Sequence, residues 1–205
     1  MDKLEAVITG AVERLRLRHP NEDIFISIHY SGEKTNIRDR SKVNELIAKK
    51  RGRYHFFGFN PETWLEVTNP VRTAYNTAMI GLVQIFPVPK IGRAIFRHLG
   101  AVIGNNGTTG VNSKIDNYFP KLIEIGDRVA LGYGSVITSH FSMEPGHICI
   151  GSTKIGDNTL VGLESVIGPV NVGKNVRVNA RSVVMRNIPD NAIVAGNPAR
   201  VIGYK

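Results

Sequence analysis

The stretch that decides the fold is residues 155–168, Ile155-Gly156-Asp157-Asn158-Thr159-Leu160-Val161-Gly162-Leu163-Glu164-Ser165-Val166-Ile167-Gly168. An aliphatic residue recurs there every six positions, and glycine directly follows each one. A period of six differs from the 3.6 of a helix, and a continuous strand does not take regular glycines, because glycine weakens strands and favours bends. The repeating unit is therefore a short strand followed by a corner.

The same rhythm continues on both sides of this stretch. Its aliphatic positions are Ile125, Leu131, Ile137, Ile155, Val161, Ile167, Val172, Val178 and Val184. Repeats that cannot bury an apolar face alone must stack around a shared core, so the rhythm predicts a solenoid of parallel β-coils. The pattern is lost from Phe141 to Thr153, which we interpret as a degenerate coil or a loop pushed outward from one.

The motif [Ile/Leu/Val]-Gly-x-x-[Ser/Thr/Val]-x resembles the hexapeptide repeat of the left-handed β-helix acyltransferases, over roughly Ile103 to Tyr204. The ending from Ile188 to Ile202, with its Asn197-Pro198-Ala199-Arg200 segment, resembles the tail of the maltose, galactoside and xenobiotic acetyltransferase group. The resemblance alone implies the left hand, since general connection rules favour the opposite one. We therefore expect an all-β fold: a left-handed parallel β-helix in residues 101–205, after a mainly α-helical N-terminal region in residues 1–100.

The residue pattern of the N-terminal region predicts several helices and one short strand. Apolar residues from Leu4 to Leu15 have helical spacing, and Ile24 to His29 alternates like a strand. Further helices are expected over Ser41–Lys50, Asn69–Phe86 and Lys90–Leu99. A cationic helix beside an apolar one can lie on a membrane surface. A solenoid's terminal coil also needs covering, so we expect this region to cap the coils, with peripheral membrane contact as the alternative.

Composition excludes several classes of protein. With 205 residues and 42% hydrophobic content the chain supports a real core. The start, Met1-Asp2-Lys3-Leu4-Glu5, lacks a secretion pattern and no apolar run approaches the roughly 20 residues of a membrane span, which predicts a cytoplasmic location. The single cysteine, Cys149, allows no internal disulfide and fits a reducing compartment. The chain has a net charge of +9, but no nucleic-acid recognition module accompanies it. We therefore interpret the charge as attraction for a phosphorylated ligand such as coenzyme A.

Acyl transfer to a hydroxyl or amine needs a base, and histidine is the natural one near neutral pH. His140 ends a hexad where the pattern breaks, and this junction matches the place where the acetyltransferase group carries its catalytic histidine. We expect His140 to deprotonate the acceptor, which attacks acetyl-CoA directly. No acyl-enzyme is required, since Cys149 has no evident activating partner. His147 is the rival base.

A carboxylate is expected near the base. Asp116 resembles the aspartate that the group places in its first coil to bind the acceptor. The alternative interpretation is that Asp116 is only a turn residue in Asp116-Asn117. Glu144 is a weaker candidate because it lies where the repeat is lost.

The resemblance also places coenzyme A along the outside of the coils. The positions matching the group's cofactor-binding residues are Gly162, Ala180, Met185, Arg186 and Arg200. The first two would contact pantetheine, Met185 would keep a backbone contact, and the arginines would face the phosphates or adenine. Lys205 stands in for a second cation, because this chain has Gly203 where the family often has one. The alternative for all five is structural: corners demand small residues, and surface arginines are often merely solvated.

The predicted function is acetyl transfer to a hydroxyl, or an amino group, of a sugar or related small molecule. The resemblance implies a homotrimer with sites between neighbouring chains. One alternative is a carbonic anhydrase of the same coil type, but only His140 and His147 lie in the coil region, where a zinc site built from histidines needs a third. Another is a non-catalytic β-helix scaffold, against which His140 and the Asn197-Pro198 tail argue. We expect no metal and no nucleic-acid partner.

Overall fold

The computed structural model describes residues 2–22, 24–28, 34–48, 53–58, 67–86, 88–144 and 146–205. Internal contacts divide the chain into two compact units. The N-terminal unit contains Met1–Ala74 and His140–Gly151, and the coil unit contains Tyr75–Ser139 and Ser152–Lys205.

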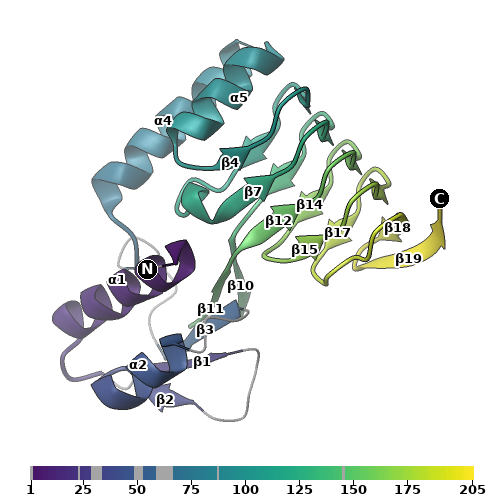
Figure 1. The fold of residues 1–205 in the computed structure, drawn as a ribbon. Coiled ribbons are helices and arrows are strands. Elements are labelled where there is room, and N and C mark those ends of the chain that lie inside the picture. Colours follow the sequence, from purple (N-terminus) through teal and green to yellow (C-terminus); the bar gives the residue numbers. More distant parts are fainter. Residues whose placement is uncertain are drawn as a thin grey trace. The chain divides into compact units, whose positions relative to one another are not determined.

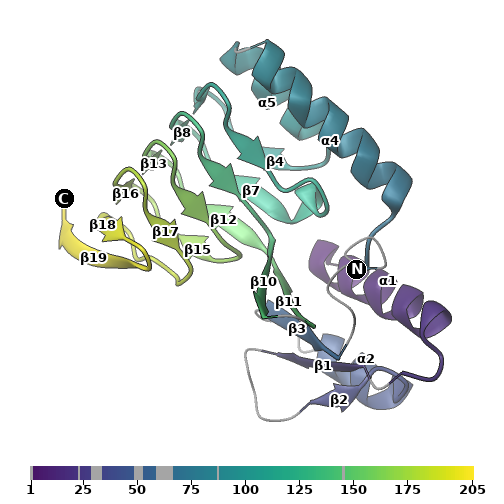
Figure 2. The same cartoon turned by 180° about the vertical axis from the view of Figure 1, so that it is seen from behind.

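The coil unit is built from short strands that belong in turn to three sheets (Figures 1 and 2). The first sheet holds β4 (Val102–Ile103), β7 (Ile123–Ile125), β12 (Thr153–Ile155) and β15 (Asn171–Val172). The second holds β5 (Thr108–Thr109), β8 (Ala130–Leu131), β13 (Leu160–Val161), β16 (Arg177–Val178), β18 (Ala192–Gly196) and β19 (Ala199–Tyr204). The third holds β6 (Lys114–Ile115), β9 (Val136–Ile137), β14 (Val166–Ile167) and β17 (Val183–Val184). All pairings are parallel except β18 with β19, which confirms the parallel β-coils that the six-residue period predicts. Each turn of the chain is a three-sided coil.

The repeating aliphatic residues meet in register inside these coils. In the third sheet, for example, Ile137 lies opposite Ile115 on one side and Ile167 on the other. The whole set is buried and forms one core that runs along the coil unit. A 3-10 helix, Pro120–Leu122, lies between β6 and β7, where the aliphatic residues Ile115 and Ile125 are ten positions apart instead of six.

The corners between the sheets explain the other repeating residues. We number them in chain order: the first corner joins the first and second sheets, the second corner joins the second and third, and the third corner returns to the first sheet. Left-handed backbone conformations recur there, at Asn106, Asn112, Asn158, Asn175 and Asn191 among others. Asparagine tolerates this conformation better than most residues, so the corners account for its recurrence in the sequence.

Aspartate side chains tie neighbouring coils together at the first corner. Asp127 Oδ1 accepts a hydrogen bond from the Asn105 N–H at 2.7 Å, and Asp157 Oδ1 accepts one from the Asp127 N–H at 2.9 Å. The latter bond, together with Lys174, lowers the pKa of Asp157. These carboxylates therefore perform a purely structural task, one coil after another.

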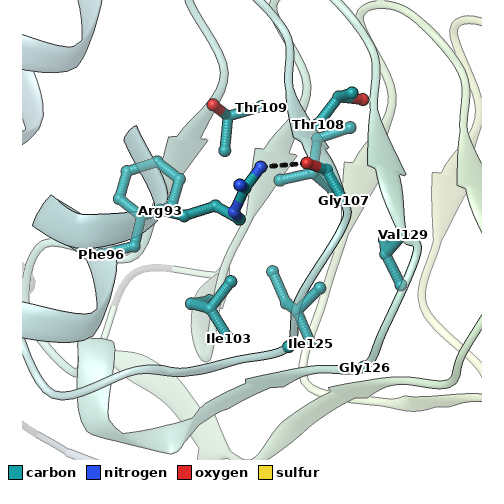
Figure 3. A pocket seen from close by; sticks show the side chains of 11 residues that line it. Arg93, Phe96, Ile103, Gly107, Thr108, Thr109, Ile125, Gly126 and Val129 are labelled. Carbon is teal, nitrogen blue, oxygen red and sulfur yellow. Dashed lines mark hydrogen bonds between the residues drawn. The ribbon is translucent and has the colours of Figure 1, made fainter. Parts of the chain in front are cut away.

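Two helices cover the first coil, α4 (Pro70–Ile85) and α5 (Pro89–His98). Phe96 of α5 and Val83 of α4 are buried in the core of the coil unit. Arg97 donates from Nε to the Ile103 carbonyl at 2.8 Å and from Nη2 to the Gly104 carbonyl at 2.7 Å. Figure 3 shows Arg93 reaching across a small pocket to donate to the Gly107 carbonyl. No earlier coil can pair with these carbonyls, so the arginines satisfy the edge that the first coil leaves open.

The N-terminal unit combines helices with an antiparallel sheet. Its helices are α1 (Lys3–Arg18) and α2 (Arg40–Ala48). Its sheet has the order β10 (His140–Glu144), β11 (His147–Gly151), β3 (Arg53–Phe57), β1 (Phe25–Ile28) and β2 (Thr35–Asn36). The β10–β11 hairpin is the segment where the six-residue repeat is lost. It leaves the coil and pairs with β3, so the reading as a loop pushed outward is confirmed.

The described part of residues 1–100 contains the expected helices and is mainly α-helical, as predicted, although a small sheet accompanies the helices. One expectation about organisation needs correction. The compact units do not divide at residue 100, because α5 and most of α4 pack on the coil while the hairpin joins the N-terminal sheet. The ends of two expected elements, at His29 and at Lys49 and Lys50, lie outside the described residues.

None of the helices within the described ranges is both long enough and apolar enough to cross a membrane.

Candidate active site

The third corner brings residues from four coils into one column. Asp116, Thr138, Gly168 and Met185 directly follow the aligned strands β6, β9, β14 and β17. Paired strands lie about 4.8 Å apart, so residues distant in sequence become neighbours here. Two of the predicted site residues, Asp116 and Met185, belong to this column.

Asp116 is buried, with 3% of its surface exposed, and its carboxylate accepts four hydrogen bonds. Oδ1 accepts from the backbone N–H groups of Tyr118 and Phe119, both at 2.8 Å. Oδ2 accepts from the Ser139 N–H at 2.7 Å and from Thr138 Oγ1 at 2.9 Å. A carboxylate has about four lone-pair sites, so these bonds fill its capacity. To bind an acceptor, Asp116 would have to give one of them up.

The two bonds to Oδ2 fix the segment that leads into His140. Thr138 is held further by its own N–H, which donates to the Ile167 carbonyl at 2.9 Å. Its carbonyl accepts from Thr153 Oγ1 at 2.6 Å. The backbone just before His140 is thus anchored to the coils before and after it. The anchoring residues Thr138, Ser139 and Thr153 were missed in the sequence, although aligning the hexads places Thr138 one coil, 22 residues, after Asp116.

His140 is the first residue of β10 and is half-buried. It follows Ser139, the last coil residue before the chain enters the N-terminal sheet, and lies opposite Ile150 in the hairpin. The predicted base therefore stands at the point where the chain leaves the coil.

The rival base His147 lies in a buried cluster of the N-terminal unit. It is 4% exposed, and its Nε2 is 2.9 Å from Nδ1 of His55, a residue 92 positions away that no sequence signal connects with it. Its Nδ1 is 3.7 Å from Glu144 Oε1, and the ring stacks on Phe57. Burial lowers the pKa of His147, an effect that Glu144 opposes. A buried ring with partners on both nitrogens is poorly suited to take a proton from an acceptor.

Cys149 belongs to the same cluster and is fully buried. Its Sγ lies 3.8 Å from Nε2 of His55, and burial raises the pKa of the thiol to about 12. A thiol that stays protonated is a weak nucleophile. In the part of the chain that the structure describes, no group of three His, Cys, Asp or Glu side chains is placed to hold a metal ion.

Gly162 and Ala180 meet at the second corner, in neighbouring coils. A Cβ added to Gly162 would lie 2.5 Å from the backbone nitrogen of Ala180, so packing alone requires a glycine there. The Gly162 N–H already donates to the Val178 carbonyl at 2.8 Å. Ala180 itself is exposed. The structural alternative therefore holds for Gly162, and pantetheine binding at this corner stays a prediction.

The other predicted cofactor residues lie near the end of the coil unit. Met185 packs over Gly168 at the third corner, and Arg186 follows it as an exposed side chain. Arg200 is exposed on β19 and donates from Nη1 to the Ala199 carbonyl at 3.1 Å. Lys205 Nζ donates to Asn175 Oδ1 at 3.0 Å. These cations are spread over a corner and the last strands, and none is buried.

Known proteins resemble this chain over most of their length. No protein-family model matches it. A Bacillus subtilis (strain 168) protein provisionally named acetyltransferase YvoF is 28% identical over 160 residues, 77% of this chain and 92% of that protein. A Staphylococcus aureus (strain MSSA476) protein provisionally named acetyltransferase SAS0727 is 32% identical over 142 residues, 64% of this chain and 88% of that protein. A solved maltose O-acetyltransferase from Clostridium difficile 630 is 25% identical, with a TM-score of 0.49, and the match covers 71% of this chain and 91% of that one.

Proposed function

Because the chain belongs to the hexapeptide-repeat acetyltransferases, we propose that it moves an acetyl group from acetyl-CoA to a hydroxyl group of a sugar or related small molecule. An amino group on such an acceptor is the second choice. The observation that carries the proposal is the anchoring of Thr138 and Ser139 by the buried Asp116, directly before His140. A fixed backbone at that position is what a histidine base needs in order to meet its acceptor reproducibly.

His140 acts as the general base in this proposal. It takes the proton from the acceptor hydroxyl while the acceptor oxygen forms a bond to the thioester carbonyl carbon. The tetrahedral intermediate then collapses, the carbon–sulfur bond breaks, and the leaving thiolate takes the proton back from the imidazolium. The products are the acetylated acceptor and coenzyme A, and His140 returns to its starting state. No covalent bond to the protein forms at any step.

Asp116 is a positioning residue in this scheme. Oδ2 binds the N–H of Ser139, one peptide bond before His140, so the carboxylate restricts the backbone from which the imidazole extends. It does so through bonds that are themselves buried and therefore costly to break. This role replaces direct acceptor binding, which the four filled lone-pair sites of Asp116 disfavour.

Coenzyme A is proposed to run along the coils past Gly162 and Ala180 to the exposed cations Arg186 and Arg200. Family membership supports this placement, as does the exposure of Ala180 and both arginines. A homotrimer, with each site completed by a neighbouring copy, follows from the same resemblance. The active enzyme is proposed to work in the cytoplasm, where acetyl-CoA is made available.

Binding of the acyl donor is the first test. Acetyl-CoA at 100 times its Kd is expected to stabilise the protein by about 2.7 kcal/mol, which raises Tm by roughly 5–10 °C for a chain of this size. Arg200→Gln is expected to weaken binding about tenfold, because it removes a charged partner of the phosphates. Arg128→Gln is the matched control, since Arg128 is a coil-corner arginine that binds Asn158 and lies outside the proposed path. No shift with acetyl-CoA would leave a non-catalytic scaffold as the better account.

The absence of an acyl-enzyme gives a second test. Cys149→Ala is expected to keep turnover within about twofold of wild type, because a buried thiol with a pKa of about 12 contributes no nucleophile. Steady-state release of coenzyme A measures the turnover, and mass spectrometry after mixing with acetyl-CoA looks for an acetylated protein. Loss of turnover in a folded Cys149→Ala protein, or an acetyl group on Cys149, would contradict direct transfer.

A further inference from the structure

Large exposed apolar side chains gather in sequence at the end of α4, at the start of α5 and at two residues between these helices. They are Leu82, Ile85, Phe86, Val88 and Ile91, with exposures of 37%, 68%, 53%, 48% and 41%. We call these five residues the apolar tip. All of them fall within ten positions of the sequence, so they form one feature and not scattered exposure of the kind that every protein surface shows.

The opposite side of the same helices already holds them to the coil. Ile80, Val83 and Phe96 are buried in the core of the coil unit, with at most 5% exposure. Arg93 and Arg97 add hydrogen bonds to the first coil. The end of α4 is thus apolar on its exposed side as well as on its buried side, whereas α5 exposes Lys90 beside Ile91. The apolar tip cannot turn inward without losing these contacts, so its cover must come from outside.

The sequence segment that carries the apolar tip contains cations and no acids. Residues 67–115 contain no aspartate or glutamate, while they include Arg72, Lys90, Arg93, Arg97 and Lys114. Lys90 lies within the tip's own sequence and is exposed. This combination of exposed aliphatic and aromatic side chains with cations complements a surface that is apolar inside and anionic outside.

A second copy of this chain fits the apolar tip less well. In a symmetric contact the cationic segments of both copies would face each other and repel. We propose that the apolar tip inserts into the headgroup boundary of an anionic phospholipid bilayer. The enzyme would then meet its acceptor at the membrane surface.

Vesicle co-sedimentation of the full chain tests this proposal. Phosphatidylcholine vesicles that contain phosphatidylglycerol are expected to bind the protein, and pure phosphatidylcholine vesicles are expected to bind it much more weakly. The double variant Ile85→Ser/Phe86→Ser is expected to lower the affinity for the anionic vesicles by about tenfold or more, because it removes two inserted side chains. Lys90→Gln is expected to lower it severalfold, and added salt to weaken the wild type.

Val71→Ser is the matched control, because Val71 is 79% exposed on the same helix but lies outside the tip. Leu17→Ser, at 80% exposure on α1, controls for hydrophobicity in general. Both are expected to bind vesicles like the wild type, and melting curves show whether each variant folds. Absence of binding to anionic vesicles, or equal binding by the folded double variant, would overturn the proposal. So would dissociation of a wild-type oligomer in the double variant by light scattering, which would assign the tip to self-association.

Discussion

Replacing His140 by alanine is expected to lower turnover by roughly 10²-fold or more while the affinity for acetyl-CoA stays unchanged. The imidazole is proposed to act only on the acceptor's proton and the leaving thiolate, and not on the nucleotide. Its removal should therefore raise the barrier of the chemical step and leave donor binding intact. Steady-state kinetics give the turnover, and a thermal shift with acetyl-CoA gives the affinity.

His147→Gln is the control for this experiment. Glutamine can keep a hydrogen bond to His55, so the buried cluster of the N-terminal unit is largely preserved. We expect this variant to keep turnover within a few-fold of wild type. Wild-type turnover in His140→Ala would remove His140 from the role of base, and a large selective loss in His147→Gln would transfer that role to His147.

Asp116→Asn is expected to lower kcat by about tenfold with little change in the KM for acetyl-CoA. The amide has nearly the same shape, but its NH₂ group must face either the N–H groups of Tyr118 and Phe119 or the N–H of Ser139. Either choice leaves buried donors without an acceptor, at a cost of about 1–3 kcal/mol. If the NH₂ group faces Ser139, the segment before His140 loses its anchor. If it faces Tyr118 and Phe119, the turn that holds residue 116 is loosened, so His140 is less well placed in either orientation.

Asp127→Asn separates positioning from simple loss of stability. Asp127 also accepts a backbone hydrogen bond, from Asn105, but it lies at the first corner. The Asp127→Asn variant should have a lower Tm, but its kcat should stay within about twofold of wild type, since none of the hydrogen bonds described for Asp127 reaches the His140 segment. Equal effects of the two variants on kcat would contradict a positioning role for Asp116. A raised KM for the acceptor with unchanged kcat in Asp116→Asn would restore direct acceptor binding.

The coil was predictable from the sequence because its signal is local. Every coil repeats the same aliphatic positions. The glycines and asparagines meet requirements of their own corners, such as the close approach of Gly162 to Ala180 or a left-handed backbone conformation. The helices α1, α2, α4 and α5 were predictable for a similar reason, since each buries one face at helical spacing. In both cases, a few neighbouring residues carry the information.

The N-terminal sheet was not predictable in this way. Its strand β3 pairs with β11, and the contact between His55 and His147 joins residues 92 positions apart. Loss of the repeat after His140 left a degenerate coil and an outward loop as alternatives, and no local pattern shows which strand the hairpin joins. The division into compact units follows from that pairing, so the boundary at residue 100 was misplaced for the same reason.

The candidate site was predictable in its residues but not in their tasks. The resemblance pointed to Asp116 and His140 by position. It could not show that both carboxylate oxygens of Asp116 are occupied, since that depends on where Tyr118, Phe119 and Ser139 direct their N–H groups. Likewise, Arg93 and Arg97 are cations on a helix in the sequence, and only the fold shows that they complete the open edge of the first coil.

The most direct measurement is acceptor-dependent release of coenzyme A thiol from acetyl-CoA, with wild type and His140→Ala compared on one panel of sugars and amino sugars. We predict that the wild type releases thiol with at least one sugar acceptor and that the variant is slower by roughly 10²-fold or more. Equal rates in the two proteins would contradict the role of His140. Binding of acetyl-CoA without thiol release on any acceptor of the panel would contradict acetyl transfer to sugars.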